Sequence, residues 1–348
     1  MSWYNTSEST NPYILWSRVR YMRSLASLPF HRCESNPKVT LEYEKNNARL
    51  EKIMTENGFH KHEGASLDSI EALALAEKQF VSAAFASRNA DGALYFNEPC
   101  SLAIYTHAGS FITVQALLGG AAFSEAHKIA SEAEELLDRE FDFAFSDKLG
   151  YLSPEISACG SGIELSCALY LPSARHGSRS QEIRNEISAF GATISPFFSR
   201  YENSGDIYTV SYIPAFGSCE DDEVTGFARF IDSLVEKERV QDRIIFACRS
   251  TLIIDKAYRA LGILAYAKMI DEEEMASLLS KIRLALCLDD TKDDAPISDI
   301  SFINLLFTES LNASVIAASG GVCAGFDECK AIRARLLNRH CAARVANQ

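Results

Sequence analysis

Apolar and polar positions follow two different patterns along the chain, one in its first two-thirds and one after about residue 245. In the first part, short runs rich in Ile, Val, Leu, Tyr and Thr predict strands, at residues 13–20, 101–106, 110–117, 164–171 and 206–213. Several runs follow one another closely, as at 93–117, which favours antiparallel pairing. The pattern therefore predicts an α+β fold with an antiparallel sheet flanked by helices.

Helical spacing of apolar residues appears between these strands and then without interruption to the end. In the first part it predicts helices over 124–141, over 179–189 and after Ser218, the first of them capped by Ser124. In the second part it predicts helices over 251–269, 271–287, 298–318 and 326–344, with Asp271 and Glu274 forming a capping box. We therefore predict two domains, a mixed one over residues 1–245 and a helical one over residues 246–348.

Composition narrows the class of protein. A chain of 348 residues with 47% hydrophobic and 23% charged residues has the composition of a globular protein. The net charge of −13 argues against a general nucleic-acid binder and against an anionic membrane surface as a partner. No apolar run reaches the length of a membrane span, and the polar first residues lack a signal-peptide pattern.

The ten cysteines are scattered, with no Cys-x-x-Cys pair. This favours reduced thiols in a cytoplasm over a disulfide framework or a zinc site. The histidines show no ligand spacing either, so we predict no resident metal.

Two arginines in the first predicted strand carry the clearest chemical signal. Side chains alternate along a strand, so Arg18 and Arg20 point to the same face. Adjacent guanidinium groups repel unless an anion lies between them, and a carboxylate or a phosphate chain suits that place. The pair therefore favours a phosphate or nucleotide site, and the alternative is a solvated or locally ion-paired strand face.

Several blocks resemble the ATP:guanidino phosphotransferases, the phosphagen kinases, and among them the bacterial protein-arginine kinases. Residues 13–30 resemble the arginine-bearing first motif, 141–152 the stretch before the catalytic loop, and 160–172 that loop and the next strand. Residues 255–264 and 281–286 resemble the C-terminal domain of protein-arginine kinases. The resemblance implies a phosphagen-kinase, or glutamine-synthetase-like, catalytic domain followed by a C-terminal helical domain.

The resemblance also implies a reaction, the transfer of a phosphoryl group from Mg-ATP to arginine. Such transfer depends on arginines that hold the phosphates and on a carboxylate that orients the guanidinium. Arg18 and Arg20 occupy the first two nucleotide-binding positions. At the two carboxylate positions the chain has Ala108 and Gly109, and the three remaining nucleotide-binding arginines align with Thr113, Glu164 and Ile194.

Other residues could supply the missing groups in a different register. Glu98, Glu155 or Glu164 could serve as the carboxylate, and Arg200 could replace a nucleotide-binding arginine. The phosphoarginine pocket of protein-arginine kinases would align with residues 324–329, where neither arginine is present. We interpret the nearby Arg333, Arg335 and Arg339 as one charged helix face.

Three functions follow from these matches. The first is a pseudokinase that has lost phosphotransfer and has a regulatory or partner-binding role, with Glu164 paired to Arg18 and Arg20 where ATP once lay. The alternatives are an active, diverged protein-arginine kinase and a non-catalytic binder of arginine-bearing peptides or a small anion.

The resemblance further implies a small zinc-binding activator or a protease-linked regulator as partner, a role in stress regulation, and a homodimer. Mg-ATP is the cofactor that the resemblance implies, and the replaced positions argue against its binding.

Overall fold

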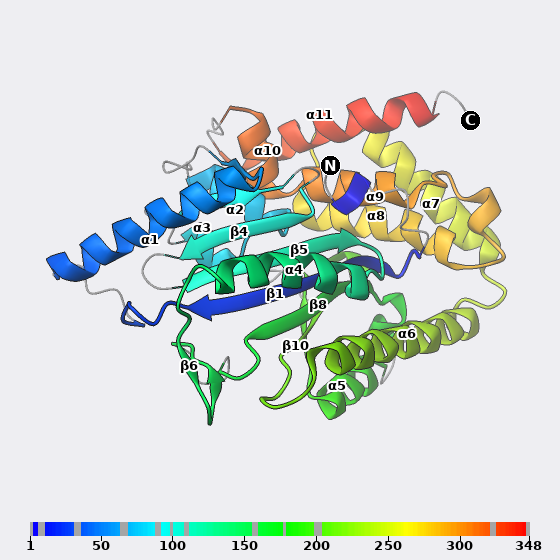
Figure 1. Ribbon diagram of the computed structural model, residues 1–348. Coiled ribbons are helices and arrows are strands. Elements are labelled where there is room, and N and C mark those ends of the chain that lie inside the picture. Colours follow the sequence, from blue (N-terminus) through cyan, green and yellow to red (C-terminus); the bar gives the residue numbers. More distant parts are fainter. Residues whose placement is uncertain are drawn as a thin grey trace.

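An eight-stranded sheet runs through the first two-thirds of the chain, in the order β2-β3-β4-β5-β1-β8-β10-β9 (Figure 1). Each neighbouring pair of strands is antiparallel. The strands of this sheet are β1 (Ile14–Ser24), β2 (His60–Lys61), β3 (Leu94–Phe96), β4 (Leu102–His107), β5 (Phe111–Gly119), β8 (Ile163–Tyr170), β9 (Thr193–Pro196) and β10 (Ile207–Tyr212). A separate hairpin joins β6 (Phe145–Ser146) and β7 (Gly150–Tyr151). The predicted α+β fold with an antiparallel sheet is confirmed.

The structure is a computed structural model that describes residues 3–5, 11–30, 36–62, 69–87, 92–97, 100–107, 111–154, 159–176, 179–197, 204–320 and 325–345. Its helices are α1 (Pro37–Glu56), α2 (Ser69–Glu77), α3 (Ala83–Ser87), α4 (Phe123–Asp138), α5 (Arg179–Phe190), α6 (Glu220–Ile245), α7 (Ser250–Tyr266), α8 (Glu272–Cys287), α9 (Ile300–Glu309), α10 (Asn312–Ala318) and α11 (Phe326–Val345). The bundle formed by α7 to α11 confirms the predicted helical region after the sheet.

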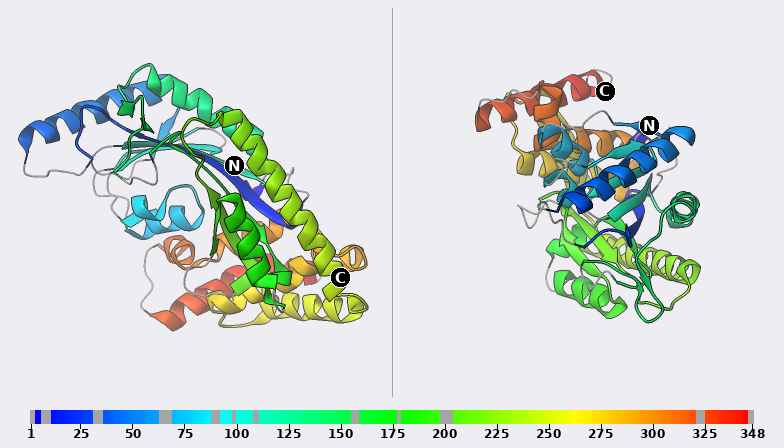
Figure 2. Two further views of the ribbon diagram at one scale, coloured as in Figure 1. Left: turned by 90° about the horizontal axis from the view of Figure 1, so that it is seen from below. Right: turned by 60° about the vertical axis from the view of Figure 1, so that its left-hand side comes forward.

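Helices cover both faces of the sheet. On one face lie α4 and α6, and on the other lie α2, α3 and the C-terminal helices (Figure 2). The alternation along β1 fits these layers: the ring of Tyr21 stacks on His127 of α4, and its hydroxyl donates to Glu220 of α6 at 2.8 Å. Arg18 points the other way, toward Gln79 between α2 and α3. The arginine face of β1 is therefore covered by helices and buried.

The predicted strands are all present within a few residues, but some helical predictions are wrong. Residues 298–318 form two helices, α9 and α10, with a bend of 77° between them. Among the described helices, none alone has the length and apolar character to cross a membrane; α9 and α10 together meet those criteria by length and composition only. Helices α1 to α3 were not predicted.

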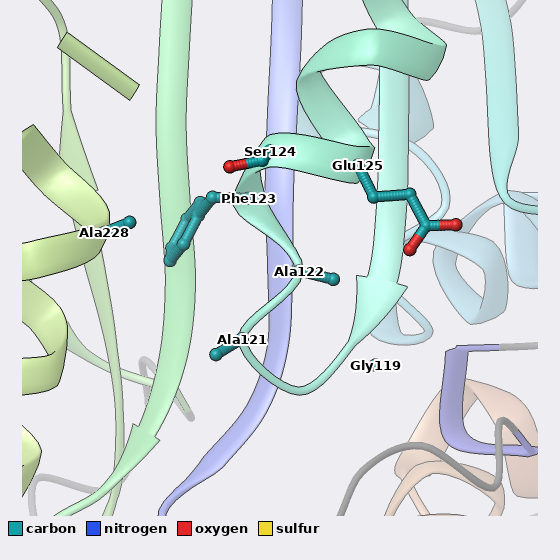
Figure 3. Close-up of a pocket in the computed structure, with 7 residues that line it drawn as sticks. All are labelled: Gly119, Ala121, Ala122, Phe123, Ser124, Glu125 and Ala228. Carbon is teal, nitrogen blue, oxygen red and sulfur yellow. The ribbon is translucent and has the colours of Figure 1, made fainter. Parts of the chain in front are cut away.

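The start of α4 corrects another prediction. The helix begins at Phe123, the residue before it is Ala122, and no side chain caps it, so Ser124 is not the cap. The amide of Ala122 instead donates to Ser17 Oγ of β1 at 2.8 Å. Figure 3 shows this turn, with Phe123 pointing toward Ala228 of α6, beside a pocket of about 370 Å³. By contrast, Asp271 caps α8 as predicted, accepting from the amide of Glu274 at 2.8 Å.

The sheet and the C-terminal bundle share one cluster of buried apolar side chains. Acidic side chains are buried where the two meet: Asp206 before β10, and Glu238 and Asp242 on α6. Tyr13 donates to Asp242 Oδ2 at 2.9 Å, and Ser280 of α8 donates to Asp206 Oδ2 at 2.6 Å. We call these three carboxylates the junction acids. The domain boundary at residue 245 stays a prediction.

Two further predictions need correction. Arg333 does not lie on a charged helix face: it is buried, and it donates to the carbonyls of Ser310 at 2.7 Å and Ile270 at 3.0 Å. Seven described cysteines are free, as expected of reduced thiols. Cys329 is disulfide-bonded, so the prediction of reduced thiols is wrong at that position.

Candidate functional site

The register of β1 brings the predicted site residues together. Strand β1 lies between β5 and β8, and Arg20 is paired with Gln115 of β5 and with Glu164 of β8. Arg18, two residues earlier, is paired with Ser166 of β8. The two arginine side chains are 8% and 10% exposed, so their charges must find partners within the protein.

Glu164 supplies the anionic partner of both arginines. Its Oε2 accepts from Arg20 Nη1 at 2.8 Å, and its Oε1 lies 3.7 Å from Arg18 Nη2. The prediction that Glu164 pairs with these arginines is confirmed. One carboxylate thus lies between two guanidinium groups, at the place where the Arg-x-Arg pattern requires an anion.

The remaining guanidinium nitrogens bond neutral acceptors. Gln115 Oε1 accepts from Arg20 Nε at 3.1 Å and from Arg20 Nη2 at 2.8 Å. Arg18 donates to Ser166 Oγ at 2.9 Å and to Gln79 Oε1 at 3.2 Å. With the two contacts to Glu164, each of the six nitrogens has a polar partner. We call these six side chains the arginine network: Arg18, Arg20, Gln79, Gln115, Glu164 and Ser166.

The charges in the network stabilise one another. Burial alone would raise the pKa of Glu164, but the charges of Arg20 and Arg18 outweigh it and hold that pKa below its usual range. A hydrogen bond from Ser211 adds to this effect. Burial, and then the charge of Arg20, lowers the pKa of Arg18 to about 10. At neutral pH all three groups are therefore charged, and one net positive charge remains.

The other predicted positions do not complete the site. Thr113 of β5 is paired with Met22 of β1, and its buried Oγ1 has no hydrogen-bond partner within the described residues. Ile194 lies on the edge strand β9, separated from β1 by β8 and β10. The remaining candidates lie outside the described residues: Ala108, Gly109, Glu98, Glu155 and Arg200. Within the described residues no group of three His, Cys, Asp or Glu side chains could hold a metal ion.

Arg23 belongs to the opposite face of β1. It donates to Glu134 of α4 at 2.6 Å and lies 3.6 Å above the ring of Tyr151. It also donates to the carbonyl of Ser161 at 3.1 Å. A side chain at Gly162, where φ is +64°, would collide with Arg23. Arg23 therefore fixes the chain that leads into β8 and thus helps to place Glu164.

Three members of the arginine network were not predicted. Gln115 and Ser166 could have been found from strand parity, because each lies on the face of a neighbouring strand that carries a predicted site residue. Gln79 has no such signal, since it lies in a turn between α2 and α3 and not on a strand.

Family models match most of the chain. The model described as "ATP:guanido phosphotransferase, C-terminal catalytic domain" matches residues 42–241. The chain belongs to the ATP:guanido phosphotransferase family. The model described as "Protein-arginine kinase McsB C-terminal domain" matches residues 250–347, which contain the helical bundle.

Relatives agree with this family, and solved structures agree with the fold. The chain is 25% identical to a protein-arginine kinase of Clostridium tetani over 84% of this chain and 86% of that one. It is 26% identical to one of Clostridium kluyveri over 90% and 91%. The fold is similar to the duplicated taurocyamine kinase of Schistosoma mansoni, with a TM-score of 0.54, 17% identity and coverage of 73% of this chain and 39% of that one. A lombricine kinase gives a TM-score of 0.50 at 13% identity, covering 67% and 68%.

Proposed function

We propose that this member of the ATP:guanido phosphotransferase family is a pseudokinase that acts by binding a protein partner. The observation that carries the proposal is the carboxylate of Glu164, which lies 2.8 Å from Arg20 and 3.7 Å from Arg18. In this family these arginines are expected to contact the phosphates of ATP. Here their nitrogens bond the protein itself.

The charge at Glu164 works against phosphotransfer in two ways. It neutralises one of the two cations that would stabilise the transferring phosphoryl group. It would also repel a bound phosphate, by about 4 kcal/mol for unit charges 4 Å apart at an effective dielectric constant near 20. A nucleotide would have to displace Glu164 or bind beside it, and either process lowers affinity.

The surroundings of Glu164 argue against the alternative of an active, diverged kinase that uses this residue as its substrate carboxylate. A carboxylate that orients a substrate guanidinium needs free oxygens, whereas those of Glu164 contact Arg18, Arg20 and Ser211. Its lowered pKa also makes it a poor proton acceptor. This alternative therefore depends on Glu98 or Glu155. The third alternative, a binder of arginine-bearing peptides, likewise needs a carboxylate outside the arginine network.

The proposal includes a cytoplasmic location for this protein, a protein partner and a homodimer. The partner would be a small zinc-binding activator or a protease-linked regulator, within stress regulation, as expected from the similarity to protein-arginine kinases. Light scattering of the purified chain measures the oligomeric state directly. A monomer at micromolar concentration would contradict the homodimer and leave the rest of the proposal in place.

Phosphotransfer itself is measured by incubating the chain with Mg-ATP and an arginine-rich protein and detecting phosphoarginine by mass spectrometry. The protein-arginine kinase of Clostridium tetani serves as the positive control. We expect no phosphoarginine above the level given by the Arg18→Ala variant. Phosphoarginine that forms with the natural chain and disappears with Arg18→Ala would overturn the proposal.

A further inference from the structure

The turn between α2 and α3 contacts the arginine network and the C-terminal bundle at the same time. Three successive half-buried residues make these contacts: Glu77, the last residue of α2, and Lys78 and Gln79, which follow it. We call these three residues together the turn. They are far in sequence from both of the regions they join. Because the three residues adjoin one another, one short segment contacts both regions.

Gln79 makes the contacts with the arginine network. Its side-chain oxygen accepts from Arg18 Nη1 at 3.2 Å, and its carbonyl accepts from Gln115 Nε2 at 2.8 Å. Gln115 in turn accepts from Arg20, so Gln79 is joined to both arginines. Its φ is +65°, a conformation that residues other than glycine rarely adopt and that persists only where the surroundings hold it.

Glu77 and Lys78 make the contacts with the bundle. The carboxylate of Glu77 accepts from the amides of Ala313 and Ser314 at 2.8 Å each. These amides open α10, where they have no partner within the helix. Lys78 Nζ lies 3.0 Å from Glu309 at the end of α9. The bundle therefore holds the turn in place, and the turn in return caps α10.

The bond between Gln79 and Arg18 is the exchangeable part of this arrangement. A neutral amide oxygen at 3.2 Å is a weaker acceptor for a guanidinium than a phosphate oxygen. A phosphate group that reached Arg18 would therefore take the place of the Gln79 side chain. Such replacement removes one of the contacts that keep the turn strained and would loosen the cap on α10.

We propose that the turn of Glu77, Lys78 and Gln79 is an internal ligand of Arg18, held there by α9 and α10, and that a phosphate-class anion competes with it. The proposal rests on the proposed function in taking Arg18 and Arg20 as a former phosphate site. Detection of phosphotransfer would overturn that function and would not alter the competition measured below. Coupling of this kind is reciprocal: release of the turn frees Arg18, and occupation of Arg18 frees the turn.

The first test measures pyrophosphate binding to the full chain by calorimetry. The parent is Glu164→Gln, which removes the repelling charge and keeps an acceptor for Arg20. We expect Gln79→Ala in this parent to bind pyrophosphate about tenfold more tightly, the order of one charge-assisted hydrogen bond. Leu73→Ala, at an exposed position of α2, is the matched control and should not differ from the parent. Equal affinities, or no saturable binding with Gln79→Ala, would overturn the proposal.

The second test measures hydrogen exchange without any ligand. We expect Gln79→Ala to speed exchange of the Ala313 and Ser314 amides about tenfold, with no change for Leu73→Ala. Gln79→Gly, which also relieves the positive φ, replaces Gln79→Ala if that variant does not fold.

In the binding test, Glu77→Ala should tighten pyrophosphate binding, as Gln79→Ala does. Unchanged exchange, or unchanged binding with Glu77→Ala, would contradict the role of the bundle.

Discussion

Two buried charged groups of residues, the arginine network and the junction acids, differ in how their charges are balanced. In the arginine network, two guanidinium groups share one carboxylate, and each nitrogen has a polar partner. Among the junction acids, Asp206 and Glu238 lie near Arg175 and Arg179. Asp242 accepts from Tyr13 and has an oxygen without a partner among the described residues.

The difference appears in the direction of the pKa shifts. Cations hold the pKa of Glu164 below its usual range, although burial acts against them. Burial, and then the charge of Glu238, raises the pKa of Asp242 to about 8. The arginine network is therefore fixed in its ionised form near neutral pH, whereas Asp242 of the junction acids exchanges a proton there. A satisfied ionic network leaves little for a ligand to gain, which is the physical basis of the proposed loss of function.

The largest expected effect comes from breaking the arginine network. Glu164→Ala leaves two buried guanidinium groups without their anion, and we expect the free energy of unfolding to fall by about 3–5 kcal/mol. Chemical denaturation monitored by circular dichroism measures it. A loss below about 1 kcal/mol would mean that the pair is not a buried ionic unit.

The next effect concerns the junction acids and depends on pH. Because the pKa of Asp242 is raised from 3.8 to about 8, the folded protein keeps a proton that the unfolded chain releases above about pH 4. Stability from this group falls as the pH rises between those values, by about 1.4 kcal/mol per pH unit at most. Between pH 5 and 7, the natural chain should lose about 3 kcal/mol more than Asp242→Asn.

Neighbouring acidic groups also contribute to the change in stability with pH, in the natural chain and in Asp242→Asn alike. Burial also raises the pKa of Glu238 and of Asp206, so they act in the same direction. Glu164 adds no slope in this window, because its pKa lies below the usual range. Parallel curves for the natural chain and Asp242→Asn would show that Asp242 is ionised in the folded protein.

The smallest effect on the free energy of unfolding is expected at an exposed ion pair. This pair is the reference for the two buried groups, the arginine network and the junction acids. Arg49 Nη2 and Glu140 Oε2 are 2.9 Å apart, with side chains 53% and 45% exposed. Glu140→Gln should change the free energy of unfolding by no more than about 0.5 kcal/mol. A loss as large as that of Glu164→Ala would remove burial as the explanation for the difference.

The sequence was sufficient for the parts of the fold and site that follow local rules. Strand parity placed Arg18 and Arg20 on one face, and the positional match to the kinase motifs placed Glu164 beside them. The match between the predicted and observed limits of β8 and β10 has the same origin, since their runs of apolar and β-branched residues end where the strands end. Strand β1 continues to Ser24, four residues beyond its predicted end.

The remaining features depend on contacts between distant segments. The sequence of α9 and α10 contains no Gly or Pro that would predict the bend between them. It is held by Arg333, which bonds the carbonyl of Ser310, and by Glu77, which caps α10. The same reasoning explains why Gln79 was missed and why Arg333 was misread as a surface residue: the partner of each is far away in sequence.

The central claim is that the protein's own side chains occupy the former nucleotide site, and calorimetry with Mg-ATP tests it most directly. The account predicts no saturable heat for the natural chain up to millimolar Mg-ATP, and saturable binding once Glu164→Gln removes the competing charge. Submillimolar binding by the natural chain that is lost in Arg18→Ala would contradict it.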